Sequence, residues 1–369
     1  MARDSLFGER IVWQGRCRAV SVPFAQKATS AAAAVVAAVT LCYAVVAAKS
    51  LGVPVGGMLL LSLWCGTIAL AAWRLPLWWR SQLQYLVTER HVIWRRGPIR
   101  RSIDIGQISY ACIRWSAGDA SVGDLVVVRA VPTGALRRTL SLTLADVEAP
   151  DRLWAIIRGV EPGAPLGSGE RPLAQRLDPG ERVLWSSAPL GSAWTTRRMA
   201  TAAMGMALAA VFVRSLAHAV PTLARVLRLH ALSPALAATL VAGAGLGMLL
   251  LLAVAVGVAY AALVRPARLA RQTRYFVTNA RVLIRRGSEE LSLDRSRIAY
   301  VIDAPSSAPS KKMHDVFLVL DGPQARALAP SGAFGGDDRD DGLKPVFAAI
   351  ADADTVGQIL RTRELDKAA

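Results

Sequence analysis

The segment at residues 85–110 reads YLVTERHVIWRRGPIRRSIDIGQISY, and residues 275–300 read YFVTNARVLIRRGSEELSLDRSRIAY. Aligned without a gap, the two segments are identical at 11 of 26 positions, among them Tyr85/Tyr275 and Thr88/Thr278. A shorter echo precedes them, because Gly8-Glu9-Arg10 followed by Trp13 matches Gly180-Glu181-Arg182 followed by Trp185. Self-similarity over so long a period predicts a tandem of one structural unit.

Each half carries two long apolar runs between the shorter echo and the longer one. They cover residues 28–48 and 51–73 in the first half and 199–220 and 231–264 in the second. A membrane-spanning helix needs about 20 apolar residues to cross a hydrocarbon core roughly 30 Å thick. With 53% hydrophobic and 19% charged residues, the chain is also more apolar than ordinary soluble proteins. We therefore predict two transmembrane hairpins, at residues 28–79 and 199–264.

Basic residues flank the apolar runs and give the chain a net charge of +17. They gather before and after each hairpin, whereas the loop of the first hairpin holds only Lys49 and that of the second holds Arg225 and Arg228. Cytoplasmic flanks of membrane helices carry such an excess. The pattern predicts a multi-pass membrane protein with both termini and the soluble domains in the cytoplasm. Nucleic acid is not an expected partner, because the sequence shows no basic face interleaved with aromatic residues.

After each hairpin, short stretches rich in β-branched residues alternate with turn signals such as Arg96-Gly97-Pro98. A helix ending near Gly159 and a helical stretch from about Gly342 to Arg363 are predicted to close the two sheets. The sequence similarity between the halves decays after Tyr300. The stretches predicted as strands are 86–88, 91–95, 101–105, 108–115, 124–130 and 138–144 in the first half, and 276–278, 281–285, 291–293, 297–303 and 315–320 in the second.

The predicted soluble domains are small and separated by a flexible linker rich in proline and glycine. A core of this size is expected to lean on its hairpin or on its twin. The predicted organisation is a cytoplasmic leader at 1–27, a hairpin at 28–79, a domain at 85–160, a linker at 161–177, a second leader at 178–198, a hairpin at 199–264 and a domain at 275–364.

The order of these motifs resembles the bacterial pleckstrin-homology-like domain family in its membrane-anchored form, present as two tandem units. The resemblance covers nearly the whole chain. It implies a fold class of membrane α-helical hairpins plus α+β or all-β domains, each domain a curved antiparallel sheet or partly open barrel with a C-terminal capping helix. It implies no catalytic residue and no shared ligand. After a Gly-Glu-Arg-x-x-Trp leader and two hydrophobic helices, the residues that carry it are Tyr85, Val87, Thr88, Arg90 and Gly97, then Tyr275, Val277, Thr278, Arg281 (displaced by one position from the place of Arg90) and Gly287.

We expect no enzyme, no cofactor and no metal site. The four histidines lie far apart in the sequence, and the four cysteines show neither metal-ligand spacing nor a disulfide framework. The acidic stretch at 337–342 departs from a calcium loop, since Arg339 takes a ligand position and Ala348 stands where the closing Glu is required. Phosphate-binding loops, nucleophile elbows and zinc-protease helices do not occur in the sequence.

Polar and small residues inside the apolar runs have two interpretations. Arg214 and His218 share a helix face and could mark a transport pathway. Arg214 comes about 22 Å after Met199 at the helical rise, near the outer end of that run, so we favour a side chain that reaches the headgroups. Gly243 and Gly247 are predicted to permit close helix packing.

Basic turns shared by both halves form the candidate interaction surface, because guanidinium groups suit phosphate and carboxylate groups. Adjacent residues on a strand point to opposite faces, so one arginine of each pair is expected to be exposed. The alternative is that these charges only discourage unwanted strand pairing. The surface consists of Arg95, Arg96, Arg285 and Arg286, extended in the first half by Arg100 and Arg101, which the second half replaces with Glu290 and Leu291.

Tryptophans and arginines at the helix ends are the candidate membrane-interface anchors. The predicted function is a non-enzymatic membrane scaffold, which presents its two domains to a protein partner or to anionic lipid headgroups in envelope maintenance. The alternative is a small four-helix transporter or channel. The sequence identifies neither the protein partner nor the oligomeric state. The anchors are Trp78, Trp79, Arg74, Arg80, Arg265 and Arg268.

Overall fold

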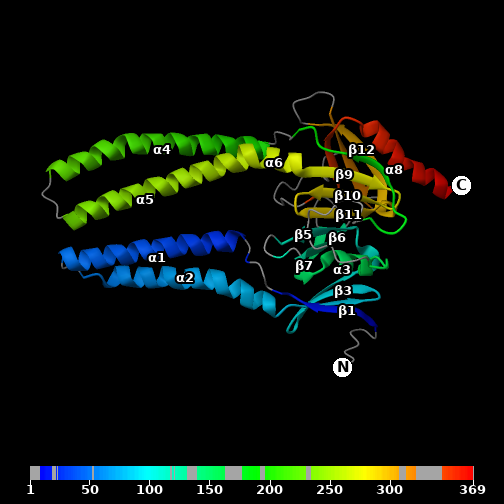
Figure 1. Cartoon of the computed structure of the whole chain (residues 1–369), viewed down its shortest axis with the longest axis horizontal. Helices are drawn as coiled ribbons and strands as arrows, with labels where there is room; N and C mark the ends of the chain where they lie inside the picture. Colours follow the sequence, from blue (N-terminus) through cyan, green and yellow to red (C-terminus); the bar gives the residue numbers. More distant parts are fainter. Residues whose placement is uncertain are drawn as a thin grey trace. The chain divides into compact units, whose positions relative to one another are not determined.

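The computed structural model of the chain divides into two compact units (Figure 1). The sheet unit comprises Met1–Ser21, Trp78–Trp194 and Ala267–Ala369, and the helix unit comprises Val22–Leu77 and Thr195–Pro266. Each unit is described by itself. The structure describes residues 9–18, 22, 24–51, 54–116, 119, 121–130, 139–162, 177–191, 196–229, 234–306, 313–320 and 343–368.

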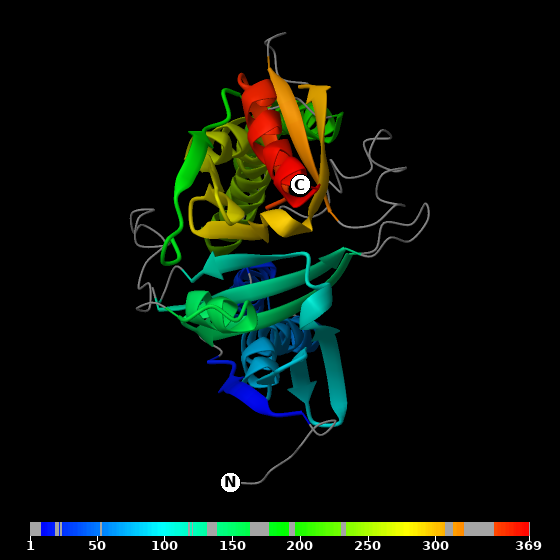
Figure 2. The same ribbon diagram turned by 90° about the vertical axis from the view of Figure 1, so that its right-hand side faces the viewer.

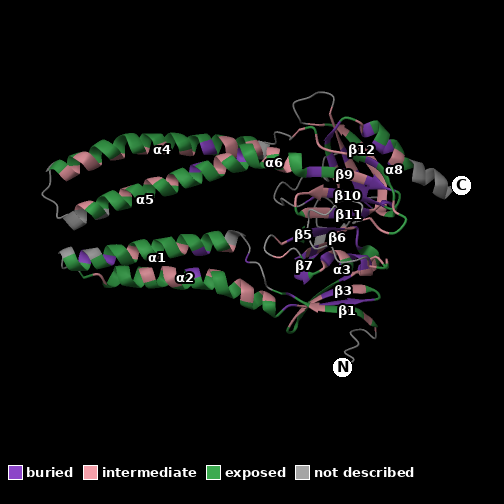
Figure 3. Cartoon of the chain, in the orientation of Figure 1, coloured by how far each residue is buried: buried purple, intermediate pink, exposed green. Residues whose placement is uncertain are grey.

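Long apolar helices make up the helix unit and continue into the residues that adjoin it in the sequence. They are α1 (Phe24–Leu51), α2 (Gly56–Ser81), α4 (Thr196–Leu229) and α5 (Pro234–Ala259), the last continuing through a π-turn at Tyr260–Val264 into α6 (Arg265–Gln272). Among the described residues, four spans are long and apolar enough to cross a membrane: Gln26–Lys49, Gly56–Ser81, Arg198–Arg228 and Leu240–Gln272. Their surfaces are mostly exposed, whereas buried residues gather in the sheets (Figure 3). Such an apolar exterior suits hydrocarbon rather than water.

Polar side chains and one glycine fix the contacts between helices. The hydroxyls of Ser30 and Ser62 each donate to a backbone carbonyl of the other helix of the first pair, both over 2.8 Å. Gly205 on α4 lies against α5, where an added Cβ would stand 3.4 Å from the nitrogen of Ala259. The predicted close packing at Gly243 and Gly247 is wrong, since a Cβ there would meet no described atom within 4 Å.

The first half of the sheet unit begins with a strand that the sequence prediction had placed in a separate leader. This strand, β1 (Ile11–Arg16), pairs antiparallel with β2 (Gln84–Thr88) across the whole of α1 and α2. The meander continues through β3 (His91–Arg96) and β4 (Ile99–Asp104) in the order β1-β2-β3-β4. Gly97 and Gly287 occupy the turns after the third strands with φ of 53° and 60°, a left-handed conformation that glycine adopts without a steric penalty.

Three more strands and a helix complete this half: β5 (Tyr110–Trp115), β6 (Val122–Ala130), β7 (Thr139–Glu148) and α3 (Pro150–Ile157). Alternate side chains of the strands face a core that α3 covers with Leu153, Trp154 and Ile157. The predicted strands and the helix ending near Gly159 are confirmed except at the strand ends: Ile105 lies in a 3-10 turn, Ile108 and Ser109 precede β5, and Arg138 lies outside the described residues.

The second half repeats this order of elements. It contains β8 (Val183–Ser187), β9 (Thr273–Thr278), β10 (Arg281–Arg286), β11 (Glu289–Asp294), β12 (Ile298–Pro305), β13 (His314–Leu320), β14 (Val346–Ile350) and α8 (Ala353–Ala368). The predicted helix from Gly342 to Arg363 is therefore wrong over Val346–Ile350, which pair with β13 as a strand. Most of the predicted linker, and the acidic stretch, lie outside the described residues.

One seven-stranded sheet joins the two halves, in the order β7-β6-β5-β11-β10-β9-β8 (Figure 2). The junction is an antiparallel ladder in which Leu291 of β11 faces Cys112 of β5. Cys112, Tyr110 and Val126 pack into the core of the second half, whereas Ala111 and Ile113 pack into the core of the first. A strand of the first half thus completes the second core, so the halves lean on each other.

Candidate functional site

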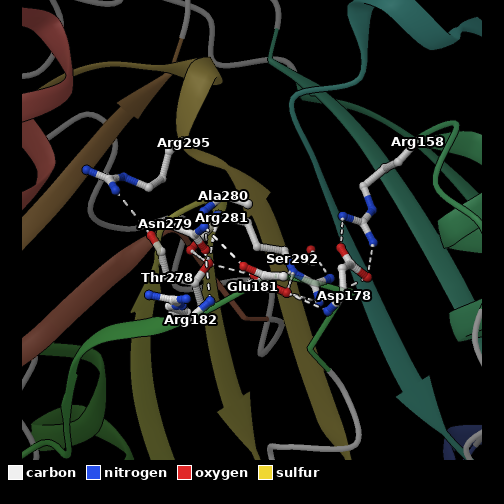
Figure 4. A network of polar contacts seen from close by, with 11 residues as sticks. Arg158, Asp178, Glu181, Arg182, Thr278, Asn279, Ala280, Arg281, Ser292 and Arg295 are labelled. Atoms are coloured by element: carbon white, nitrogen blue, oxygen red, sulfur yellow. Dashed lines mark hydrogen bonds and ion pairs between the residues drawn. The ribbon is translucent and has the colours of Figure 1, made fainter. Parts of the chain in front are cut away.

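A buried polar network centres on Glu181, the glutamate of the second leader (Figure 4). Its carboxylate accepts a hydrogen bond from the Thr278 hydroxyl over 2.6 Å and binds the Arg281 guanidinium over 3.0 Å. The Glu181 side chain is 1% exposed and that of Arg281 is 4% exposed. Thr278 also accepts from the backbone N–H of Arg281, so the network fixes the turn between β9 and β10. The shorter and the longer sequence echoes therefore meet in space.

Asp178 extends this network to the helix of the first half. Two nitrogens of Arg158, just after α3, donate to the Asp178 carboxylate over 2.7 and 3.2 Å, and Arg281 lies 3.6 Å from the same group. Burial opposes ionisation of Asp178, but the hydrogen bonds from Arg158 and the charge of Arg281 outweigh it and lower the pKa of Asp178. Burial likewise opposes the charge of Arg281, and Glu181 outweighs it and raises the pKa of Arg281.

On the other side of this turn, Arg295 ties the second sheet to its capping helix. Its guanidinium donates to the carbonyl of Thr278 over 3.2 Å and to the carbonyl of Ile359 in α8. With Arg158 and Arg281, it gives the region three arginines that donate to carboxylates, a hydroxyl or backbone carbonyls of the protein itself. The arrangement suits a structural staple.

The first half contains the corresponding site in a more open form. Glu9 accepts from the Thr88 hydroxyl over 2.6 Å, and His91 takes the place of Arg281 with its Nδ1 3.0 Å from the Glu9 carboxylate. The hydrogen bond from Thr88, and then that with His91, hold the pKa of Glu9 below its ordinary value. The structural counterpart of Arg281 is therefore His91, not the displaced Arg90 of the sequence motif.

The repeated tyrosine of each half clamps the last strand. The Tyr85 hydroxyl donates to the carbonyl of Ala145 and accepts from its N–H, both over 3.0 Å. Tyr275 does the same at Ala348, over 3.5 and 3.1 Å. Burial raises the pKa of both phenols, that of Tyr275 to about 12. The clamps show that structural correspondence continues well beyond Tyr300, where the sequence similarity decays.

Each clamp is followed by a residue with positive φ: Asp146 at 48° and Ala349 at 51°. An aspartate of the sixth strand supports it, since Asp124 accepts from the N–H of Asp146 over 2.8 Å and Asp315 accepts from that of Ala349 over 2.7 Å. Asp146 is 1% exposed, and Arg80 lies 3.3 Å from its carboxylate. Arg80, predicted as a membrane anchor, is thus placed on a buried carboxylate of the sheet unit.

The predicted interaction surface is divided by the fold. Arg95, Arg96, Arg285 and Arg286 are all half-buried, so the expected exposure of one arginine in each pair is not met. Arg96 lies over the ring of Trp79 at the end of α2, and Arg286 pairs with Glu289 over 2.6 Å. Trp79 therefore supports β3 through a cation–π contact.

Only the first half presents a long basic strand edge. Arg100 and Arg101 are exposed on β4, the terminal strand of its sheet in the described part of the chain. Their counterparts Glu290 and Leu291 lie on β11, which β5 covers. The predicted difference between the halves therefore has a structural cause: Leu291 is fully buried where Arg101 is exposed. Among the predicted anchors, Arg74, Trp78, Trp79, Arg265 and Arg268 are exposed.

Sequence reasoning missed the sites around Glu9 and Glu181, although both glutamates lie in the shorter echo. The shorter echo was assigned to the two leaders. The available signal was that both halves repeat a glutamate in the shorter echo and a threonine in the longer one. Comparison of the chain with family models, with curated proteins and with solved structures gives no match. Among the described residues, no group of three or more His, Cys, Asp or Glu side chains is arranged to hold a metal ion.

Proposed function

We propose that this chain is a non-enzymatic scaffold of the bacterial inner membrane, built from two tandem pleckstrin-homology-like domains, each with a membrane hairpin. The observation that carries the proposal is the placement of the long helices. Each pair lies between the first and second strands of an antiparallel sheet, and those two strands are hydrogen-bonded to each other. Four strands, three strands and a closing helix in each half support the family resemblance.

The strand pairing also supports the topology. Because β1 precedes α1 and its partner β2 follows α2, their pairing supports a topology in which both ends of the first helix pair lie on one side of the membrane. The same holds for β8 and β9 around the second pair. Basic residues at the ends of the pairs then favour the cytoplasm as that side.

The contacts proposed for the scaffold are a protein partner or anionic lipid headgroups. Arg100 and Arg101 on β4, together with Arg74 and Arg268 on the helices, are exposed cations that could meet such groups. Charges of this kind near a bilayer attract anionic lipid by about 1 kcal/mol each. We further propose that these contacts serve envelope maintenance.

A transporter or channel is the second candidate, and one observation favours it. Arg214 and His218 are exposed near the middle of α4, because that helix runs on to Leu229. The sequence prediction had placed Arg214 near the outer end of its run, and the longer helix removes that argument. Ionisable groups deep in a membrane helix often mark a pathway.

Topology reporters in the full chain test the scaffold. A reporter inserted at Pro54 or at Ser233, which lies outside the described residues, should be translocated, and one fused after Ala369 should stay in the cytoplasm. Cytoplasmic activity at either hairpin tip would contradict the proposal. Proteoliposomes of the full chain separate the two candidates: solute flux that disappears in Arg214→Ala would establish the transporter instead, with Arg74→Ala as the control arginine.

A further inference from the structure

The junction between the halves joins two strands that do not correspond to each other. In the repeated order of elements, β11 corresponds to β4, and β5 corresponds to β12. The second half therefore offers its fourth strand to the fifth strand of the first half, which is a head-to-tail contact. In the described part of the chain, β4 and β12 remain the terminal strands of their own sheets.

We propose that a second copy of this chain pairs its β12 with β4 of the first copy, in the antiparallel register that β5 and β11 use. The internal ladder places Leu291 opposite Cys112 and Glu290 opposite Ile113. The equivalence of β5 and β12 follows from their neighbours, since Arg114 faces Asp124 and Ala304 faces Asp315. Asp124 and Asp315 make the same contact in the two halves. Transferred to the free edges, this register places Arg100 opposite Asp303 and Arg101 opposite Ile302.

The charges on β4, β5, β11 and β12 favour the pairing of β4 with β12 over other pairings of these strands. Inside the chain, Arg114 of β5 lies 3.2 Å from Glu289 of β11. Between chains, exposed Arg100 would face Asp303, an exposed acid of β12 whose carboxylate also lies 2.8 Å from His314. Opposite charges directly across a ladder stabilise it, and like charges destabilise it. Pairing of β4 with β5 would bring arginines together, and pairing of β11 with β12 would bring acidic residues together. The charges therefore favour the pairing of β4 with β12.

Packing on β12 supports the same occupant. At the internal junction, Tyr110 and Cys112 project from β5 into the second core. Their counterparts Tyr300 and Ile302 are half-buried and pack on Val319 as an apolar cluster apart from the two main cores. On the opposing edge, Ile99 of β4 is 55% exposed. In the assembly Ile99 would lie opposite Ala304, diagonally across the inter-chain ladder from Ile302.

A contact of this kind can continue from chain to chain. Head-to-tail interfaces leave one unused edge at each end, so they form closed rings when the rotation closes and open filaments when it does not. Each half carries its own helix pair at the same place in the chain. A symmetry operation that relates one half to the next along the assembly therefore also relates their helix pairs.

Cysteine crosslinking in full-length protein tests the register. The background variant carries Cys42→Ala and Cys65→Ala, which leaves the buried Cys17 and Cys112. Chains with Arg100→Cys and differently tagged chains with Asp303→Cys are mixed in detergent and mildly oxidised. Directly opposite residues on paired strands are close enough for a disulfide. We expect a mixed dimer, with less product when Val301→Cys, two residues along β12, replaces Asp303→Cys.

Charge exchange tests the interaction independently. In a dilution series followed by analytical ultracentrifugation, Arg100→Asp and Asp303→Arg should each weaken self-association by about tenfold, and the double variant should restore it. Glu148→Arg, which changes an exposed charge on β7, serves as the control and should leave it unchanged. A dimer of Arg100→Cys chains alone, a monomeric wild-type protein, or a double variant no better than the singles would overturn the proposal.

Discussion

At the scale of single residues, two glutamates in the same sequence motif have different burial. Glu181 is almost fully buried with an arginine, whereas Glu9 is 15% exposed and contacts the half-buried His91. Removing one member of a buried ion pair leaves the other charge uncompensated, which costs about 3–5 kcal/mol. The second site therefore depends more strongly on its glutamate than the first.

We predict that Glu181→Gln lowers the thermal midpoint of the purified protein by roughly 5–10 °C, because Arg281 loses its main counter-charge. Glu9→Gln is the matched control and should lower it clearly less. The double variant Glu181→Met with Arg281→Met should cost less than Glu181→Gln alone, since it leaves no orphaned charge. Equal losses for Glu9→Gln and Glu181→Gln would show that burial does not decide the difference.

A second residue-scale effect depends on pH. Burial raises the pKa of Asp124, and the neighbouring carboxylate of Asp146 raises it further. The native state therefore binds this proton more tightly than the unfolded state, so ionisation of Asp124 destabilises the fold. This penalty is absent below the ordinary aspartate pKa of about 4 and complete above the raised value.

Asp124→Asn should thus stabilise the protein at pH 8, and its advantage should shrink as the pH falls toward 4. The amide oxygen can still accept from the N–H of Asp146, so the local backbone bond survives. Unfolding midpoints measured between pH 4 and pH 8 check this. Asp315→Asn is the control, because Asp315 accepts its hydrogen bond from the N–H of Ala349, whose side chain carries no carboxylate. A gain that is constant across this range would contradict the mechanism.

At the scale of elements, β5 is shared between two cores, and one thiol reports on it. Cys112 is buried at the junction, and burial raises its pKa to about 12. Alkylation of this thiol at neutral pH therefore requires the junction to open. Cys17, buried in the first core, offers a matched reference.

We predict that Leu291→Ala, which removes a fully buried side chain opposite Cys112, costs about 2–5 kcal/mol and accelerates labelling of Cys112 by maleimide. The labelling rate of Cys17 should change much less. Mass spectrometry of the Cys42→Ala, Cys65→Ala background resolves the two sites. Equal acceleration at both thiols would mean that the two cores open together and not at their junction.

The strands that the sequence predicted well are those bounded by turns and packed within one half. β3 and β10 end at Gly97 and Gly287, so composition and turn chemistry agree there. Val346–Ile350 was mistaken for helix because periodicity does not distinguish a short, continuous apolar run in a strand from one in a helix, and the positive φ of Ala349 has no signature in an alanine. β1 and β8 were missed because their partners lie beyond a hairpin in the sequence.

At the scale of the molecule, the long apolar runs alone predicted the two helix pairs, since an apolar run of that length has few other uses. The pairing of β5 with β11 had no comparable signal. The antiparallel ladder pairs four residues of each strand, among them Arg114 with Glu289 and Cys112 with Leu291. Sequence periodicity reports only on residues that are near each other along the chain, so it gives no signal for contacts between distant segments.

The position of the helices between the first two strands also determines when the sheet can form during biosynthesis. When β1 leaves the ribosome, its partner β2 has not been made, and the whole helix pair must follow before β2 emerges. At about 5–20 residues per second, β1 waits several seconds with unpaired backbone groups. In the proposed topology, the sheet can close only after both helices have returned the chain to its starting side. Folding of the sheet would then depend on correct insertion, because a chain with only one helix of a pair across the membrane would leave its first strand unpaired, in a form that proteases can recognise.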